Sequence, residues 1–347
     1  MVALGLDWLL VGSPHNRRYL SGFTGSDGYL LVSAEQALLA TDFRYYEQVE
    51  QQAPDFALAQ LTGSRLRSLA SILQQVVGGE ERLGFEAEHL TVSLYETLQV
   101  QAGQAQWIPT RGLVEGLRAI KDEAELAAIR QAVRLTDEAL EAVAAALRPG
   151  HTERQVAWYL ERHMREHGAE GLAFEIIVGS GPNGARPHAT ISDRPLQAGE
   201  PIVIDMGCRV DGYCADLTRT LVLGQPDSRF QELYAVVLQA QEAAERGLRA
   251  GVSGQEADAL ARSIISEAGY AEQFGHSLGH GVGLEVHEMP SLSALDDTNL
   301  PPGAVVTVEP GIYVPGWGGI RIEDMGVVQP DGFEIFTGCS KEPRRPL

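Results

Sequence analysis

The sequence predicts an α+β protein of two domains, in which a smaller α/β domain precedes a larger domain with an internal pseudo-two-fold repeat. The chain has 347 residues, more than most single domains contain. Its first third alternates short apolar runs with helical stretches, and the remainder repeats a pattern of two helices and a hairpin. We place the boundary so that residues 1–115 form the first domain and residues 116–347 the second.

The composition limits the classes of partner. Acidic residues outnumber basic ones, 47 to 27, and the net charge of −20 argues against nucleic acid or an anionic membrane as a partner. The sequence contains no long apolar run and no basic segment ahead of an apolar one, which predicts a cytoplasmic protein without a membrane span. The three cysteines, Cys208, Cys214 and Cys339, lack CxxC spacing. We expect buried thiols instead of disulfides or a thiolate zinc site.

The first domain is predicted as α/β from its alternating elements. Strands are expected at LDWLLVG, GYLLV and QALLAT, and helices at RYYEQVEQQA and SRLRSLASILQQVV. Residues 19–28, YLSGFTGSDG, are expected to form turns, and because no GxGxxG or P-loop spacing occurs, we assign them no cofactor. A long alanine-rich helix then begins the second domain and ends at Pro149 and Gly150.

The second domain contains the repeat. The segment from Glu141 aligns with the segment from Glu242 at an offset of 101 residues, so that Thr152 and Ser253 fall at matching helix N-caps. The similarity continues into strands, because GEPIVID ends at Asp205 and GAVVTVE ends at Glu309. We therefore expect two similar halves with a site between them.

Each predicted hairpin carries two acids. They are Asp205 and Asp216 in the first hairpin and Glu309 and Glu323 in the second. An unpaired carboxylate in a buried sheet costs several kcal/mol or becomes protonated, so these acids need cations. A salt bridge to Arg219 or Arg321 would explain one acid, but two symmetry-related pairs favour two divalent metal ions.

Histidines supply the remaining ligand chemistry. His276, His280 and His287 occur in HSLGHGVGLEVHE, where the alternating glycines favour an extended segment over an HExxH-type helix. His188, in the loop VGSGPNGARPHAT, corresponds roughly to His287 in the repeat. Oxygen-rich ligation with one imidazole favours Mn²⁺, with Co²⁺ or Zn²⁺ as alternatives. Two such ions activate water and polarise a carbonyl, which is the chemistry of amide hydrolysis.

Taken together, the motifs PNGARPHA, DMG with YCADLTRT, HSLGHGVGLEVHE, VEPGIY and RIED resemble the pita-bread metallopeptidases, the family of methionine aminopeptidase, aminopeptidase P and prolidase. The resemblance covers about residues 118 to 335. The first domain resembles the N-terminal domain of the aminopeptidase P, prolidase and creatinase branch. The resemblance implies a pita-bread catalytic domain and, from relatives, a homodimer.

The resemblance also implies roles for individual residues. The metal ligands would be Asp205, Asp216, His280, Glu309 and Glu323, with Glu309 as the general base as well. His188 and His287 would contact the scissile amide and stabilise the oxyanion, and His276 would line the proline pocket. Arg321 and Tyr313 would hold the Asp205 carboxylate.

Several functions stay open at this stage. The favoured activity is an Xaa-Pro aminopeptidase, which acts on peptides with proline in second position, and the alternative is an Xaa-Pro dipeptidase, or prolidase. A non-catalytic binding module would fit if a metal ligand were missing, yet all five are present. The same five residues disfavour creatinase, which is metal-free, and the extra domain disfavours methionine aminopeptidase.

Overall fold

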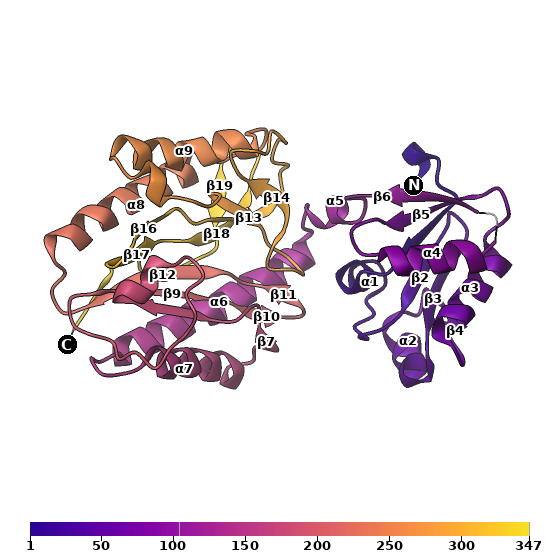
Figure 1. Ribbon diagram of the computed structural model, residues 1–347, viewed down its shortest axis with the longest axis horizontal. Coiled ribbons are helices and arrows are strands. Elements are labelled where there is room, and N and C mark those ends of the chain that lie inside the picture. Colours follow the sequence, from indigo (N-terminus) through magenta and orange to yellow (C-terminus); the bar gives the residue numbers. More distant parts are fainter. Residues whose placement is uncertain (104, 347) are drawn as a thin grey trace. The chain divides into compact units, whose positions relative to one another are not determined.

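A computed structural model describes residues 1–103 and 105–346 (Figure 1). The chain divides into two compact units, one from Met1 to Leu117 and one from Arg118 onward. None of the helices in the described part combines the length and hydrophobicity that spanning a bilayer requires. All three cysteines are buried and free, as the sequence predicted.

The first unit is built on a six-stranded sheet in the order β4-β3-β2-β1-β5-β6. In chain order its elements are η1 Val2–Leu4, β1 Trp8–Val11, α1 Pro14–Ser21, β2 Tyr29–Val32, β3 Ala37–Thr41, η2 Phe43–Tyr45, α2 Tyr46–Gln52, β4 Ala57–Gln60, α3 Arg65–Val76, β5 Arg82–Glu86, α4 Val92–Gln101 and β6 Gln106–Thr110. The strand β1 pairs in parallel with β5 and in antiparallel fashion with β2.

Both faces of this sheet are covered. Successive residues of β1 point to opposite faces, so Trp8 and Leu10 belong to one apolar cluster while Leu9 and Val11 belong to another. The strands and helices expected from the sequence are present. Two helices were not predicted, α1 and α4, and the expectation of turns throughout residues 19–28 was wrong for Tyr19 to Ser21, which lie in α1.

The second unit contains the repeat. Its first half comprises α5 Glu115–Arg118, which crosses the boundary, then α6 Glu123–Ala146, α7 Glu153–Glu166, β7 Gly171–Leu172, β8 Ile177–Ser180, η3 Gly181–Ala185, β9 Pro201–Met206, β10 Cys208–Val210, β11 Tyr213–Cys214 and β12 Leu217–Leu223. Its second half comprises α8 Ser228–Gly247, α9 Gly254–Glu267, η4 Ala271–Gln273, β13 Gly279–Gly281, β14 Glu288–Leu292, β15 Val305–Val308, β16 Gly311–Val314, β17 Gly318–Arg321, β18 Asp324–Val328, β19 Phe333–Ile335 and β20 Arg344–Arg345.

The two halves have the same core arrangement. Strands β8, β9 and β12 are neighbours in one sheet, and β13, β15 and β18 are neighbours in the other, all with antiparallel pairing. Helices α6 and α7 lie on one side of these strands and α8 and α9 on the other (Figure 1). The predicted N-caps are confirmed, because Thr152 and Ser253 each begin their helix with a capping box.

Candidate active site

The four acids come together because of strand register. Met206 of β9 pairs with Leu217 of β12, and Val308 of β15 pairs with Asp324 of β18. In each half, therefore, the end of one strand and the start of its partner lie at the same edge of the sheet. Asp205 and Glu309 lie at the ends of β9 and β15, and Asp216 and Glu323 immediately precede β12 and β18.

His280 lies among these acids. Its Nε2 is 3.2 Å from Glu309 Oε1 and 3.6 Å from Asp216 Oδ2. Ligand atoms of Asp216, His280 and Glu323 all lie within 4.8 Å of one another. The Nδ1 of His280 donates to the backbone carbonyl of Gly281 over 3.1 Å, which leaves Nε2 to face the carboxylates. An imidazole oriented in this way is typical of a metal ligand.

Crowding of buried carboxylates perturbs their protonation. Burial raises the pKa of Asp205, and it raises the pKa of Asp216 and Glu323 well above the usual range, with repulsion between the acids adding to the effect. Burial also acts on Glu309, but the hydrogen bond and charge of His280 outweigh it and lower the pKa of Glu309 to about 2. Such a cluster binds protons or cations strongly, because isolated negative charges are costly in a buried site.

Two carboxylate oxygens of the acid cluster have no partner within the described residues. Asp205 Oδ1 and Glu323 Oε1 are buried without a hydrogen bond. Buried polar atoms in native proteins are nearly always satisfied, so unpaired oxygens here indicate that another group belongs at the site. Four carboxylates, one imidazole and two unsatisfied oxygens are a donor set that fits divalent metal ions.

Arg321 orients Asp205 from outside the acid cluster. Its Nη2 lies 2.5 Å from Asp205 Oδ2, Nη1 donates to the Tyr313 hydroxyl over 2.8 Å, and Nε donates to Thr218 Oγ1 over 2.9 Å. Tyr313 reaches Asp205 only through Arg321. Its hydroxyl lies 3.0 Å from Nε2 of His276. Burial raises the pKa of Tyr313 to about 12, so the hydroxyl stays protonated and donates a hydrogen bond to that ring nitrogen.

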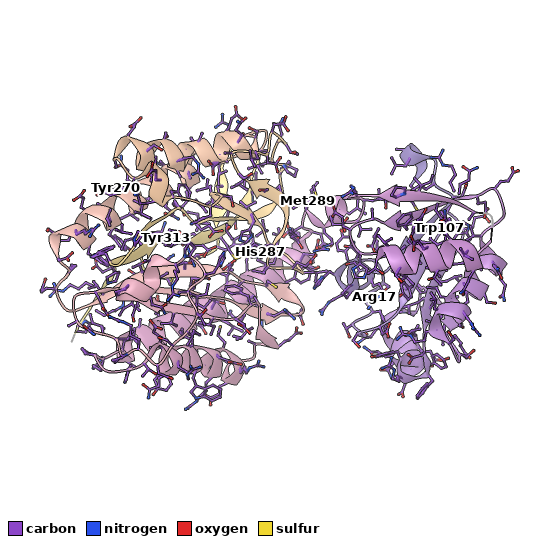
Figure 2. The ribbon with its side chains drawn as sticks, viewed as in Figure 1. Arg17, Trp107, Tyr270, His287, Met289 and Tyr313 are labelled. Atoms are coloured by element: carbon purple, nitrogen blue, oxygen red, sulfur yellow. The ribbon has the colours of Figure 1, made fainter. Side chains whose placement is uncertain are left out.

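The predicted histidines line one cavity with the acids. Its volume is about 380 Å³, and its walls include His188, His276, His280, His287, Asp205, Asp216, Glu309, Arg321 and Glu323, together with Phe174, Glu175, Ile177, Pro187 and Ser277. The rings of His280 and His287 have centroids 4.1 Å apart. Burial lowers the pKa of both His276 and His287, which favours neutral imidazoles near pH 7. Figure 2 labels His287 and Tyr313, which come from the segment before β14 and from β16.

The glycines around His280 allow neighbouring segments of the chain to approach closely. A Cβ on Gly279 would lie 2.1 Å from the Thr307 carbonyl oxygen, and one on Gly281 would lie 2.2 Å from the Met289 carbonyl oxygen. Any larger residue would therefore push the strands apart. The predicted extended conformation of the segment is confirmed, since β13 spans Gly279–Gly281 and no helix includes these histidines.

Sequence reasoning missed the acids that hold the histidine-bearing loops. Asp258 on α9 accepts from the backbone N–H of Leu278, and its partner Arg262 donates to the carbonyl of His276. Glu153 on α7 plays a similar part for the loop that carries His188, and Glu288 for the loop that carries His287. The sequence offered one signal, for Glu288, which lies within the histidine motif itself. Glu153 directly follows the N-cap Thr152, where residues are usually exposed, so nothing in the sequence indicated its burial.

Residues 127–330 match Metallopeptidase family M24, and residues 1–120 match the Creatinase/Prolidase N-terminal domain. The chain belongs to metallopeptidase family M24. The predicted family, its pita-bread catalytic fold and the creatinase-type N-terminal domain are confirmed, and the protein is a peptidase.

Relatives within family M24 span the whole chain. A Bacillus subtilis protein described as uncharacterized peptidase YqhT is 40% identical over 339 residues, covering 98% of this chain and 96% of that protein. A solved Xaa-Pro dipeptidase from Bacillus anthracis is 43% identical, has a TM-score of 0.95 and aligns over 100% of this chain and 96% of its own. An X-Pro aminopeptidase from Thermotoga maritima is 38% identical, with a TM-score of 0.90 and coverage of 99% and 98%. Relatives of both activities are thus close in sequence and structure.

Proposed function

We propose that this M24 peptidase is an Xaa-Pro aminopeptidase, which releases the first residue from peptides with proline in second position. The proposal includes two divalent metal ions per chain, held by Asp205, Asp216, His280, Glu309 and Glu323. The unpaired buried oxygens of Asp205 and Glu323 support metal binding at this place. When bound, the two ions would acidify a water molecule and polarise the scissile carbonyl.

The protein's own residues would then perform the proton transfers and hold the substrate. Glu309 is assigned as the general base that would accept a proton from the attacking water, because it lines the cavity and its Oε1 lies 3.2 Å from Nε2 of His280. His188 and His287 line the same cavity and would donate to the oxygen that gains charge as the amide carbonyl is attacked.

His276 is assigned to the pocket for the proline ring. Its Nδ1 donates to the Ser277 carbonyl over 2.8 Å, and its Nε2 accepts from Tyr313, so its imidazole is fixed on both sides. A neutral, immobile ring presents an apolar face to the substrate. Together with Phe174 and Ile177 on the cavity wall, it would favour a compact apolar residue such as proline.

The charges that line the cavity are the observation on which the aminopeptidase assignment rests. A dipeptidase has to hold the free carboxylate of the proline, and a buried carboxylate without a cation is costly. Among the described residues that line the cavity, Arg321 is the only lysine or arginine, and it is already bound to Asp205, Tyr313 and Thr218. The exposed Glu175 on the same wall would repel a carboxylate. A peptide that continues beyond proline avoids both difficulties.

The alternative activity is Xaa-Pro dipeptidase. It is favoured by the names of relatives such as the Bacillus anthracis protein and an Xaa-Pro dipeptidase from Pyrococcus horikoshii, which is 36% identical over 338 residues. Steady-state kinetics with Xaa-Pro and Xaa-Pro-Ala decide between the two. We expect kcat/KM for the tripeptide to equal or exceed that for the dipeptide, and Xaa-Ala analogues to be poor substrates. Cleavage of the dipeptide with no action on Xaa-Pro-Ala would establish the dipeptidase.

Three further parts of the proposal concern the metal, the assembly and the compartment. We propose Mn²⁺ as the native ion because the ligand set is rich in oxygen, with Co²⁺ or Zn²⁺ as alternatives. We also propose a homodimer in the cytoplasm. Light scattering at working concentration tests the assembly, and a monomeric mass would contradict it.

A further inference from the structure

A buried carboxylate lies directly beside His287 in the chain. The side chain of Glu288 is 4% exposed, and both of its oxygens are bound by cations. Lys121 Nζ lies 2.8 Å from Oε1, and Arg118 Nη2 lies 2.5 Å from Oε2. Oε2 also accepts from the backbone N–H of Glu285 over 3.3 Å. Glu288 is therefore fixed from three directions.

The two cations come from the segment that begins the second unit. Arg118 ends α5 and is the first residue of that unit, and Lys121 follows before α6. The Lys121 side chain is fully buried, and its backbone N–H donates to the carbonyl of Gly303, just before β15. The start of the unit is thus tied to the β13–β14 segment, 167 residues away in sequence.

The local backbone is shaped around the Glu288 carboxylate. A Cβ on Gly283 would lie 2.3 Å from Glu288 Oε1, so a larger residue would displace the carboxylate from its present position. Glu288 also pairs with Gly281, next to His280, in the register of β13 and β14. The bound carboxylate consequently sets the path of the chain between His280 and His287.

His287 itself has little to hold its ring. Among the hydrogen bonds of the described residues, none involves the His287 imidazole, and its ring contact is with His280. By contrast, His276 and His280 each have a ring nitrogen bonded to a backbone carbonyl. The position of the His287 ring therefore depends on its backbone, which Glu288 anchors.

We propose that Lys121 and Arg118 are positioning residues, which act through Glu288 to hold His287 at the reacting amide. The inference rests on the proposed role of His287 as a donor to the oxyanion. A simpler interpretation is that the ion cluster only stabilises the fold, but buried ion pairs often contribute little net stability relative to apolar replacements. A misplacement of about 1 Å at a catalytic group can lower the rate about 10²-fold.

The first experiment measures kcat and KM for Xaa-Pro-Ala with Lys121→Met. We expect kcat to fall by about 10- to 100-fold while KM changes less than about two-fold, because the oxyanion donor acts in the transition state. Lys121→Arg, which keeps the charge, should recover part of kcat. The matched control is Arg130→Met, which removes a partly exposed cation from α6 whose partner Glu334 is exposed; its kcat should match that of the unaltered protein.

The second experiment separates positioning from stability by repeating the substitution in a His287→Ala background. If Lys121 acts through His287, Lys121→Met will lower kcat little or not at all there, so the two effects will be strongly non-additive. If Lys121→Met does not fold by circular dichroism, Glu288→Gln, which has nearly the same volume, takes its place in the same cycle. Full additivity of the two substitutions would overturn the proposal.

The outcomes also distinguish this proposal from the proposed function. If His287→Ala alone leaves kcat unchanged, the assigned role of His287 is wrong. If His287→Ala lowers kcat but neither Lys121→Met nor Glu288→Gln does, the positioning proposal alone is wrong.

Discussion

The loops that carry His188 and His287 occupy related places in the two halves, yet they are held by different chemistry. In the first half, the fully buried Glu153 accepts hydrogen bonds from neutral groups, namely the backbone N–H and hydroxyl of Ser180, the amide of Asn183, and the backbone N–H and hydroxyl of Ser192. In the second half, Glu288 is held by the cations Arg118 and Lys121.

This difference shows how a repeated fold can become functionally asymmetric. The donors to Glu153 all lie within 39 residues of it, so the first loop is held by its own half. The cations on Glu288 come from the segment that precedes α6, so the second loop depends on a part of the chain outside its own half. We expect the first loop to respond to local substitutions and the second to changes at the start of the catalytic unit.

The largest loss of activity is expected at the acids that the two halves contribute to the site. Glu309→Ala removes a proposed metal ligand and the proposed base, so turnover of Xaa-Pro-Ala should fall by at least about 10³-fold. Glu334→Ala, which removes an exposed acid on β19, is the control and should retain full activity. A near-normal rate for Glu309→Ala at saturating metal would refute the assignment.

The next largest loss of activity is expected at the two related histidines, one from each half. His188→Ala and His287→Ala should each lower kcat by about 10²-fold with little change in KM, because removing one donor to a developing oxyanion costs about that much. Steady-state kinetics of both variants provide the comparison. An unchanged kcat with a raised KM for either one would make that histidine a substrate-binding residue instead.

The carboxylate that holds the first loop, Glu153, should contribute strongly to stability. Glu153→Ala leaves several buried donors without an acceptor, so the free energy of unfolding should fall by roughly 3 kcal/mol. Glu166→Ala, at the exposed end of the same helix, should change it by less than about 0.5 kcal/mol. Urea denaturation measures both. A loss below about 1 kcal/mol for Glu153→Ala would mean that water replaces the carboxylate.

The smallest effect concerns a titrating group that only the second half possesses. Burial, with hydrogen bonding and charge from Asp324, raises the pKa of Glu245 on α8 to about 7, although Lys341 opposes this. The position 101 residues earlier is Ala144. Because the folded state holds this proton more tightly than the unfolded state, the stabilising contribution is present below about pH 4.5 and is lost as the pH rises to 7.

Comparison of the protein with its Glu245→Gln variant isolates that contribution. Between pH 4.5 and 7 the stability of the variant relative to the unaltered protein should rise, by at most about 3 kcal/mol. Melting temperatures across this range provide the measurement. A constant difference between the two proteins would show that Glu245 titrates normally.

Much of the site was predictable because its residues follow strand and repeat patterns. Asp205 and Glu309 end matching apolar strands, and the glycines around His280 indicated an extended segment, so sequence alone placed acids and imidazole together. The helix α1 was missed for a physical reason: it is short and polar, and Nη1 and Nη2 of its buried Arg17 donate to backbone carbonyls.

The ion pairs that hold Glu288 could not be predicted in the same way. Arg118 and Lys121 lie in RAIKDE, where charged residues are usually exposed, and their partner is distant in sequence. Nothing in a single sequence reveals that a lysine is buried when its counterion is so remote. The route from Tyr313 to Asp205 by way of Arg321 likewise depends on three segments meeting in space.

The central claim is that carboxylates from both halves, with His280, hold two metal ions. Titration of metal-stripped protein with Mn²⁺, followed by calorimetry and elemental analysis, tests it most directly. We predict two ions per chain for the unaltered protein, and fewer than two for Asp216→Ala from the first half and for Glu323→Ala from the second. Binding of no ion, or of two ions by both variants, would contradict the account.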